Sequence, residues 1–564
     1  MIFQNLMVLF SIVLLCYREC DHDSLISHQY HPLLMTQKRI NQIKSLFREP
    51  IRIFVDTFRI EQPDSFACIN GDETITWGGK TVKCTNNDLI NDAKKNVIIA
   101  TSNNVIRFIQ SFLSVNRFSD PIPQSSWPGI AYVEEKLISG CDLVLNLFPR
   151  PYGATSSTLA SAGAILFESN ENRPVQGMVF FNVATLPESS QDANSEENEF
   201  FMTVFHEICH VLGISQSMFS KWRDSLGFPY DPFPKTEIQE KGKTFTIIHT
   251  PNAHKYALKR FGVETFSFSQ QSCPSGIEFE DGGGSGTRGS HPEGRVFFGE
   301  VMVGLTTGES VISDLTMSLL ADTGWYDVNY SYAKGLSWGN GNALDKTPLT
   351  NFPVKPPQES FPSHYLCQPD ETQDICTHDF KSHGYCYSGI ELLSQPYEVY
   401  QAGKAFYNPN NYSIIGLLWV YDFQLIKVKY ANRDCTKSTS QKIFESEEFG
   451  SSSRCFMADY IGSKSPMCFA TRCDGDSLFI TVDKSEKECK YENQELTFGY
   501  YTLKCPKPHY VCRISQIDGI SQPPTDTLIW KSLDVGGIAV SSIFGTIALL
   551  SNRNQRVESD NSNF

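Results

Sequence analysis

The stretch that most constrains this chain is residues 205–213, which read Phe-His-Glu-Ile-Cys-His-Val-Leu-Gly. His206 and His210 are four residues apart, so on a helix their side chains lie on one face, one turn from each other. Two imidazoles at this spacing can bind one zinc ion, and Glu207 lies beside the metal, where it can take a proton from a bound water. A pattern this short recurs by chance, so its interpretation depends on the surrounding sequence.

The sequence around this motif predicts an amphipathic helix. Asn194 is suited to the N-cap, and Glu197 follows three residues later as in a capping box. Large apolar residues then recur at helical spacing and form one stripe: Phe201, Val204, Phe205, Ile208 and Leu212. Gly213 stands where a helix needs a left-handed residue to end. We therefore expect the motif near the C-terminal end of a rigid helix.

A zinc hydrolase needs a third protein ligand and an open position for water. A compact arrangement would place a histidine three residues after Gly213, but Gln216 stands there. The third ligand must come from further along the chain, and either a carboxylate or a distant histidine satisfies the chemistry. The candidates are Glu237, Glu240, Glu264, His249, His254 and His291. His291 differs from the others because it lies in the glycine-rich segment 282–295, whose backbone can approach another element closely.

The region before the motif predicts strands and one long helical segment. Residues 51–60 alternate like a first strand, and residues 87–116 carry apolar residues at helical spacing. Three further apolar runs fit strands: 144–148, 162–167 and 178–183. Pro149 and Pro151 should end the first of them. We expect an α+β domain in which a mixed sheet leads directly into the motif helix.

Length and charge narrow the class of protein. The chain has 564 residues, 40% of them hydrophobic and 20% charged, which is typical of a globular protein. A chain of this length should divide into about two to four domains. Its formal net charge is −15, and it has no dense block of Lys and Arg. This balance argues against a nucleic-acid partner.

The start of the chain predicts export. Residues 6–16 are an apolar run that is too short for a membrane span and typical of a secretory signal, so residues 1–19 are predicted to be a signal peptide. The acceptor sequons at Asn329 and Asn411 predict a glycoprotein and agree with export.

Cysteine usage points in the same direction. Of the 17 cysteines, ten lie after residue 360, a density that indicates disulfides in an exported chain. Setting Cys16, Cys20 and Cys209 aside leaves 14, enough for seven bridges. No CxxC pair occurs between Cys367 and Cys512, which favours a disulfide-rich module there over a second zinc site.

Two further segments suggest processing and attachment. Residues 20–48 are polar and then helical in pattern, which predicts a pro-segment, and within it the Cys20 thiolate is a candidate to cap the metal until cleavage. Residues 535–550 are apolar but only 16 long, whereas a span needs about 20. This segment fits either a single short membrane span or a loose or stapled tail.

Together these residues resemble the leishmanolysin family of zinc metallopeptidases, metzincins in which a long insertion precedes the last histidine. His206, Glu207, His210 and Gly213 match the first part of the family motif, and His291 after the glycine-rich loop resembles the second.

The resemblance extends beyond the histidines. Met302, eleven residues after His291, matches the family's methionine turn, and residues 316–326 resemble the helix and exit that close the catalytic domain. Cys20 is similar to the family's pro-segment cysteine. Pro292 departs from the pattern, which carries a large apolar residue after the third histidine, so we expect a modified loop around an intact site.

The resemblance implies a secreted or cell-surface zinc endopeptidase that is made as a zymogen and hydrolyses protein substrates. One Zn²⁺ would be held by His206, His210 and His291, with Glu207 as general base and Met302 packed beneath the ligands. The alternative is a catalytically silent surface adhesion or binding protein with the same fold. Glu207 argues against that alternative, because a silent site has no need of its carboxylate.

The same reading implies a metzincin-like catalytic domain followed by a disulfide-rich C-terminal domain. The expected divisions are a signal peptide at 1–19, a pro-segment at 20–48, an N-terminal catalytic subdomain at 49–213, a central region at 214–350, a Cys-rich domain at 351–515 and a tail at 516–564.

Overall fold

The computed structural model describes residues 18–19, 33–35, 48–154, 156–189, 198–240, 243–283, 287–306, 308, 310–355, 360–367, 374–390 and 414–519. Several of the predictions above fall on other residues. Most of the predicted signal peptide and pro-segment, Cys20, Asn194, the sequon at Asn411 and the segment 535–550 lie outside the described residues.

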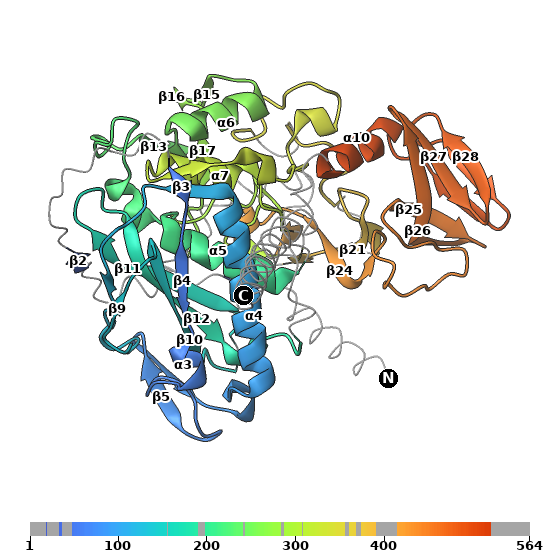
Figure 1. Ribbon diagram of the computed structural model, residues 1–564. Coiled ribbons are helices and arrows are strands. Elements are labelled where there is room, and N and C mark those ends of the chain that lie inside the picture. The colour runs from blue at the N-terminus through green and yellow to red at the C-terminus, as the bar shows by residue number, and fades with distance from the viewer. Residues whose placement is uncertain are drawn as a thin grey trace, which may run out of the picture.

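A five-stranded mixed sheet forms the centre of the N-terminal half (Figure 1), in the order β2-β11-β12-β10-β4. Its strands are β2 (Leu33–Met35), β4 (Ile53–Asp56), β10 (Leu143–Arg150), β11 (Ala160–Glu168) and β12 (Pro174–Asn182). Strands β4, β10 and β12 run parallel, whereas β11 is antiparallel to β12. Strand β2 pairs with the outer edge of β11.

Two of these strands differ from the sequence prediction. The predicted first strand is shorter than expected, because helix α3 (Phe58–Glu61) takes up its last residues. Strand β10 does not stop at Pro149 but continues to Arg150. Its pairing with β4 ends at Asn146, so at Pro149 the strand has a neighbour on one side only, where a proline is tolerated.

Both faces of this sheet are buried. Because successive side chains of a strand point to opposite faces of the sheet, Leu143, Leu145 and Leu147 of β10 join one hydrophobic cluster and Phe148 joins another. The first cluster includes helices α4 (Asp92–Phe112) and α5 (Glu199–Leu212), which pack together on the same face (Figure 1). The second cluster covers the opposite face and contains Trp77, from the hairpin β5 (Thr74–Trp77) and β6 (Lys80–Lys83).

The chain between α5 and the third histidine forms its own small unit. Its three-stranded antiparallel sheet has the order β13-β14-β17, with β13 at Lys235–Glu240, β14 at Lys243–Ile248 and β17 at Ile277–Phe279. Helices α6 (Pro251–Phe261) and α7 (Asp314–Asp322) pack against each other beside it. The last helical turn of α7 leads into β19 (Tyr326–Val328), which pairs with β7 (Leu113–Val115) at the end of α4.

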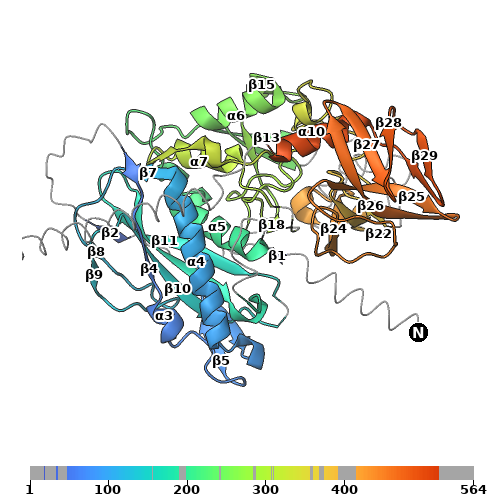
Figure 2. The same ribbon diagram turned by 45° about the vertical axis from the view of Figure 1, so that its right-hand side comes forward.

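The C-terminal part is mostly antiparallel sheet and lies on the far side of this central unit (Figure 2). Its six-stranded sheet contains β25 (Ser453–Tyr460), β26 (Ser463–Asp474), β27 (Ser477–Val482), β28 (Ser485–Cys489), β29 (Glu495–Phe498) and β30 (Tyr501–Lys504). A three-stranded sheet joins β20 (Ile375–Cys376), β21 (Ser382–Cys386) and β24 (Lys427–Asp434). Helix α10 (Pro508–Gly519) follows the last strand.

Short two-residue and three-residue strands make up the rest of the described β-structure. They are β1 (Arg18–Glu19), β3 (Glu49–Pro50), β8 (Ile122–Pro123), β9 (Leu137–Ile138), β15 (Thr265–Ser267), β16 (Ser272–Pro274), β18 (Leu305–Thr306), β22 (Ser388–Ile390) and β23 (Ile414–Gly416). One of these pairings joins distant parts of the chain, because Arg18–Glu19 pairs with Leu305–Thr306.

Six disulfides link described residues, five of them in the C-terminal part. The bridges are Cys68–Cys84, Cys367–Cys386, Cys376–Cys455, Cys435–Cys468, Cys473–Cys512 and Cys489–Cys505. All ten cysteines after residue 360 are therefore bridged, and the prediction of a disulfide-rich module is confirmed. The expectation of seven bridges is wrong, because Cys141 and Cys273 are buried as free thiols in two different clusters.

Within the part of the chain that the structure describes, none of the helices has the length and apolar character that crossing a membrane requires.

Candidate metal centre

Three histidines from two distant parts of the chain meet at one point. His206 and His210 project from α5, and His291 comes from the loop after β17. Their Nε2 atoms are separated by 2.9 Å, 3.1 Å and 3.3 Å. A tetrahedral zinc ion with Zn–N bonds of about 2.05 Å holds its nitrogen ligands about 3.3 Å apart. The triangle of nitrogens therefore has the size that a zinc ion requires.

The other ring nitrogen of each histidine fixes the tautomer. Nδ1 of His206 donates to the carbonyl of Val301 at 2.7 Å, and Nδ1 of His210 donates to the carbonyl of Ile214 at 2.6 Å. Nδ1 of His291 donates to the carbonyl of Thr287 at 2.8 Å. A carbonyl can only accept, so each neutral ring carries its proton on Nδ1 and turns a lone pair on Nε2 towards the common point. Three converging lone pairs repel one another unless a cation lies between them, and this donor set fits a metal ion.

The sheet and α4 determine where α5 lies. Phe205 packs on Phe108 and Phe112 of α4, with ring centroids 5.8 Å and 6.2 Å apart. On the sheet side, a Cβ at Gly177 of β12 would lie 2.2 Å from Cγ1 of Val211, so only glycine admits the helix at this depth. The helix is capped by Asn198, whose side chain accepts from the Phe200 amide at 2.8 Å. The N-terminal end thus lies closer to the motif than a cap at Asn194 would place it.

Gly213 ends the helix directly beneath Trp325. Its φ of +132° is open to glycine and strained for other residues, and a Cβ there would lie 2.7 Å from the Trp325 ring. The Gly213 amide closes the last turn by donating to the carbonyls of Cys209 and His210. This exit turns the chain so that the carbonyl of Ile214 meets the ring of His210.

Strand β17 brings in the third histidine. The Glu280 amide donates to the carbonyl of His291 at 2.9 Å, and the Glu293 amide donates to the carbonyl of Glu278 at 2.9 Å. Residues 291–293 thereby extend the small sheet as an extra antiparallel segment, with Pro292 opposite Phe279. The proline donates no hydrogen bond in this pairing, and His291 still meets His206 and His210.

The glycine-rich loop also contacts the exit of α5. The Gln216 amide donates to Oγ of Ser290 at 2.9 Å, and a Cβ at Gly289 would lie 2.5 Å from the Gln216 side chain. Gln216, which stands where a compact motif would have a histidine, thus anchors the loop that supplies His291 from a distance.

Met302 lies in a fully buried turn beside the histidines. Glu300 fixes this turn, since its carboxylate accepts from the Met302 amide at 2.5 Å and from the hydroxyls of Ser313 and Thr316. A Cβ at Gly304 would lie 2.2 Å from Cγ2 of Thr287 and 3.5 Å from the His291 ring. The turn therefore packs against the loop of His291, and its Val301 carbonyl accepts the hydrogen bond from His206.

Burial sets the electrostatics of the centre. His206, Glu207, His210 and His291 are all at most 6% exposed. Burial lowers the pKa of His206 to about 4, which keeps the ring neutral, the form that binds a metal. Burial also raises the pKa of Glu300 to about 7, although three donors favour its charged form.

The other candidate ligands are engaged elsewhere. Glu237 is exposed and pairs with Lys235 at 2.8 Å, and Glu240 accepts from Ser269. His249 contacts Thr236, while His254 bonds to the carbonyl of Ser275 and pairs with the exposed Glu264. Six residues were candidates for the third metal ligand, and His291 is the one that lies next to His206 and His210 in the structure.

The sequence interpretation missed the groups that orient the centre. Val301, Ile214 and Thr287 act through backbone carbonyls, which no side-chain pattern reveals. Three glutamates that it also missed are at most 2% exposed: Glu278, Glu293 and Glu300. The sequence does carry a signal for two of them, because Glu278 and Glu300 are single acids flanked by apolar residues or glycine.

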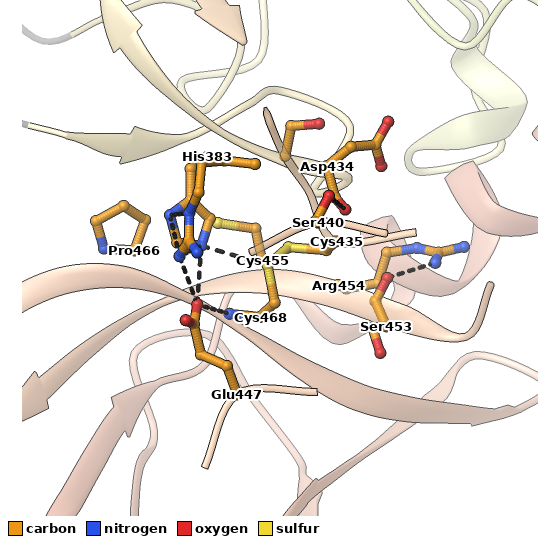
Figure 3. The surroundings of a disulfide bond; sticks show 12 residues. His383, Asp434, Cys435, Ser440, Glu447, Ser453, Arg454, Cys455, Pro466 and Cys468 are labelled. Carbon is orange, nitrogen blue, oxygen red and sulfur yellow. Dashed lines mark hydrogen bonds and ion pairs between the residues drawn. A yellow bond between two sulfur atoms is a disulfide. The ribbon is translucent and has the colours of Figure 1, made fainter. Parts of the chain in front are cut away.

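A second group of His, Cys and carboxylate lies in the C-terminal part (Figure 3). His383 contacts Sγ of Cys468 at 3.3 Å and pairs with Glu447 at 3.4 Å. Its cysteines are consumed in the bridges Cys376–Cys455 and Cys435–Cys468, so they offer no thiolate to a metal. This group is a buried polar core around two disulfides.

Comparison with known proteins gives independent information about the family of this chain. The sequence model of the peptidase family described as leishmanolysin matches residues 22–500. A leishmanolysin-like peptidase of Drosophila pseudoobscura pseudoobscura is 24% identical over 432 residues, which cover 63% of this chain and 60% of that protein. One of Caenorhabditis elegans is 31% identical over 218 residues, covering 33% of this chain and 31% of that protein.

Leishmanolysin of Leishmania major is 22% identical over 469 residues, covering 79% of this chain and 72% of that protein. The chain thus spans less than two thirds of the length of the insect and nematode relatives.

Proposed function

Because the chain belongs to the leishmanolysin family of metallopeptidases, we propose that it is a secreted or cell-surface zinc endopeptidase, made as a zymogen, that hydrolyses peptide bonds in proteins. The observation that carries this proposal is the convergence of three Nε2 lone pairs within 3.3 Å, next in sequence to a buried glutamate. The cofactor in this proposal is one Zn²⁺ per chain, and the catalytic domain is of the metzincin type.

His206, His210 and His291 would hold the metal through Nε2. Zinc, when bound by these three histidines, would supply a Lewis acid for the scissile carbonyl and would lower the pKa of a water towards neutrality. Glu207 accepts the proton of the attacking water and then delivers it to the leaving amine. Glu207 lies on the same helix as His206 and His210, which keeps its carboxylate close to the metal that they would hold. Met302 packs beneath the three histidines and does not bind the metal.

The experiment measures casein hydrolysis and zinc content of the purified chain, with and without a zinc chelator. Glu207→Gln should abolish hydrolysis while the protein keeps its zinc, and Glu207→Ala should do the same. Glu237→Gln, which removes an exposed carboxyl on β13, is the matched control and should leave both unchanged. Hydrolysis by the Glu207 variants at the wild-type rate would refute the assignment.

A second variant separates the ligand question from the base. His291→Ala should lose both metal and activity. Full zinc occupancy in that variant would instead favour a carboxylate as the third ligand. If the wild-type chain binds zinc but cleaves no protein after release of its pro-segment, the silent adhesion or binding protein becomes the better reading.

The zymogen proposal places the pro-segment at 20–48 and assigns Cys20 as the residue that caps the metal. One pairing within this segment supports it. Strand β2 occupies the edge of β11, whose unpaired backbone would be exposed without it. Cys20→Ser should therefore raise the activity of the full chain, whereas the wild type should need removal of 20–48.

The remaining organisation is proposed from the sequence. We assign residues 1–19 as signal peptide, 49–213 and 214–350 as the two parts of the catalytic domain, and 351–515 as the Cys-rich domain. Residues 516–564 form a tail that holds the candidate membrane segment 535–550. Asn329, the sequon within the described residues, is exposed, as glycosylation requires.

A further inference from the structure

A second cluster of acidic side chains lies beside the loop that carries His291. Its carboxyl groups come from β17 and the residues after it, from the segment after His291 and from the C-terminal part. They belong to Glu278, Glu280, Asp281, Glu293 and Asp422, and two cations face them, Lys243 and Arg295. Five carboxyl groups against two cations leave an excess of three negative charges if all are ionised.

Lys243 and Arg295 form ion pairs with four of these five acids. Nζ of Lys243 lies 2.5 Å from Asp422, 2.8 Å from Glu293, 3.3 Å from Asp281 and 3.5 Å from Glu278. Arg295 bridges Glu278 at 2.6 Å and Asp422 at 2.9 Å. Glu278, Glu280 and Glu293 are at most 1% exposed. An uncompensated charge at this depth is costly unless a counter-ion or a proton neutralises it.

Glu280 is the acid whose charge these pairs leave uncompensated. Its Oε1 accepts from the Gly282 amide at 2.8 Å. Its Oε2 is buried and has no hydrogen-bond partner among the described residues. One carboxyl oxygen each from Glu280, Asp281 and Glu293 lie within 4.8 Å of one another. A buried carboxyl group with one oxygen that lacks a partner, beside two further carboxyl groups, is the arrangement that a bound cation completes.

We propose that Glu280, Asp281 and Glu293 form a second cation site, separate from the three histidines and selective for Ca²⁺. Hard divalent cations prefer oxygen ligands, whereas zinc prefers the nitrogens of the neighbouring centre. Ca²⁺ takes six to eight oxygens in flexible geometry, whereas Mg²⁺ demands near-ideal octahedral geometry and keeps several of its waters, so a site in which three carboxyl groups supply oxygens suits Ca²⁺ better. Waters would complete the coordination from the side of Asp281, the least buried of the three.

The site would act on the third histidine through the backbone. The Glu280 amide donates to the carbonyl of His291, and the Gly289 amide donates to the carbonyl of Glu280. Glu293 lies two residues after His291 on the same added segment. A cation that joins Glu280 to Glu293 therefore fixes the register between β17 and the loop of His291. This proposal concerns a different ion from the zinc of the proposed function and does not depend on peptidase activity.

Trp419 offers a direct probe of the site. Its ring packs over two glycines that follow Glu280, since a Cβ at Gly283 would lie 2.2 Å from it and one at Gly282 would lie 3.1 Å from it. Terbium(III) replaces Ca²⁺ at oxygen sites and luminesces when a nearby tryptophan absorbs. We expect the full chain, freed of calcium and reloaded with zinc, to show Tb³⁺ emission excited through tryptophan and displaced by CaCl₂.

Glu280→Gln is the decisive variant, because its amide oxygen can still accept from Gly282 while the charge is lost. Terbium emission should fall, and the Ca²⁺ concentration needed for half-maximal effect should rise by about tenfold or more. Glu237→Gln on β13 removes an exposed charge from the same small sheet and should change neither. Trp419→Phe should lose the sensitised emission while it keeps the Ca²⁺ effect on thermal stability.

Thermal unfolding distinguishes the cation from a shared proton. With a cation site, CaCl₂ raises the Tm of the wild type, and Glu280→Gln lowers Tm at the CaCl₂ concentration that saturates the wild type and shifts the response to higher CaCl₂. If Glu280 is instead neutralised by a proton, Tm is independent of CaCl₂ and Glu280→Gln raises it, which would overturn the proposal. A Tm response to MgCl₂ or ZnCl₂ but not to CaCl₂ would overturn the assignment of the ion.

Discussion

The backbone carbonyl of Val301 accepts a 2.7 Å hydrogen bond from Nδ1 of His206. The residue that orients the first histidine of the helix motif is thus one position before Met302, on a turn that lies 95 residues further along the chain. The geometry of the motif therefore depends on a loop that the motif itself does not encode. Metal-binding histidines are commonly oriented in this way, and loss of such a partner weakens metal binding.

Glu300 should control zinc affinity without touching the histidines. Glu300→Ala leaves the Met302 amide and the Ser313 and Thr316 hydroxyls without their acceptor, and each unpaired buried donor costs about 1–3 kcal/mol. The turn should loosen and release the carbonyl of Val301. We expect zinc affinity to fall about 10- to 100-fold, measured by competition with a zinc-binding dye.

Thr316→Val is the matched control for Glu300→Ala. It removes one donor but leaves Glu300 bonded to Met302 and Ser313, so it should retain most of the zinc affinity. Wild-type zinc affinity and Tm in Glu300→Ala would show that the turn is held by packing alone.

The sequence predicted the local features of the site and missed its long-range supports. The stripe from Phe201 to Leu212 predicts an amphipathic helix, and these residues are buried in α5. The helix differs from the prediction because it is buried on almost every side, with only Glu199 and Thr203 partly exposed. The histidine spacing follows from helix geometry alone, so residues 206 and 210 could be paired without a structure. The selection of His291 from six candidates rests on the glycine-rich segment around it and on family resemblance, because spacing along the chain does not report which distant residue a loop brings near.

The errors concern features that tertiary structure decides. Pro149 is accommodated in β10 because β4 ends before it, a matter of strand length in a neighbour. Cys141 and Cys273 remain free because the fold buries them in separate clusters, whereas the sequence shows only that 14 cysteines are left once three of the 17 are set aside. The cluster around Lys243 joins residues up to 179 positions apart, and spacing along the chain cannot reveal that meeting.

Gly304 should be irreplaceable for a steric reason that a second substitution can relieve. A Cβ at this position would lie 2.2 Å from Cγ2 of Thr287, whose carbonyl orients His291. Gly304→Ala should displace Thr287 and lower zinc affinity by about tenfold or more. Thr287→Ser lacks the clashing methyl group, so the double variant Gly304→Ala with Thr287→Ser should recover most of the affinity. Equal losses in the single and the double variant would rule out this contact as the cause.

Gly213→Ala should destabilise the protein by more than its backbone conformation alone explains. The residue has φ +132°, and its Cβ would also lie 2.7 Å from Trp325. Gly129 has φ +75°, and a Cβ added there would meet no atom within 4 Å. Gly129→Ala therefore measures the cost of a positive φ without a clash, about 1 kcal/mol. Chemical unfolding should show a clearly larger loss for Gly213→Ala, together with weaker zinc binding through the displaced carbonyl of Ile214. Equal losses in the two variants would leave no role for the contact with Trp325.

The carboxylate of Glu447 should contribute to stability at neutral pH and lose that contribution in acid. Burial opposes its charge, but His383, the amides of Ile443 and Phe444, and Arg433 lower its pKa to about 2. Because the folded pKa lies below the unfolded value of about 4.3, the stabilisation is fully present above the unfolded pKa and is lost as the pH falls towards 2. The shift corresponds to roughly 3 kcal/mol at neutral pH. About half of this stabilisation remains at pH 3, so Glu447→Gln should lower Tm strongly at pH 6 and clearly less at pH 3. A Tm difference that does not change between these pH values would contradict the assignment. Glu486→Gln removes an exposed carboxylate paired with Arg472 and serves as the control, with little effect at either pH.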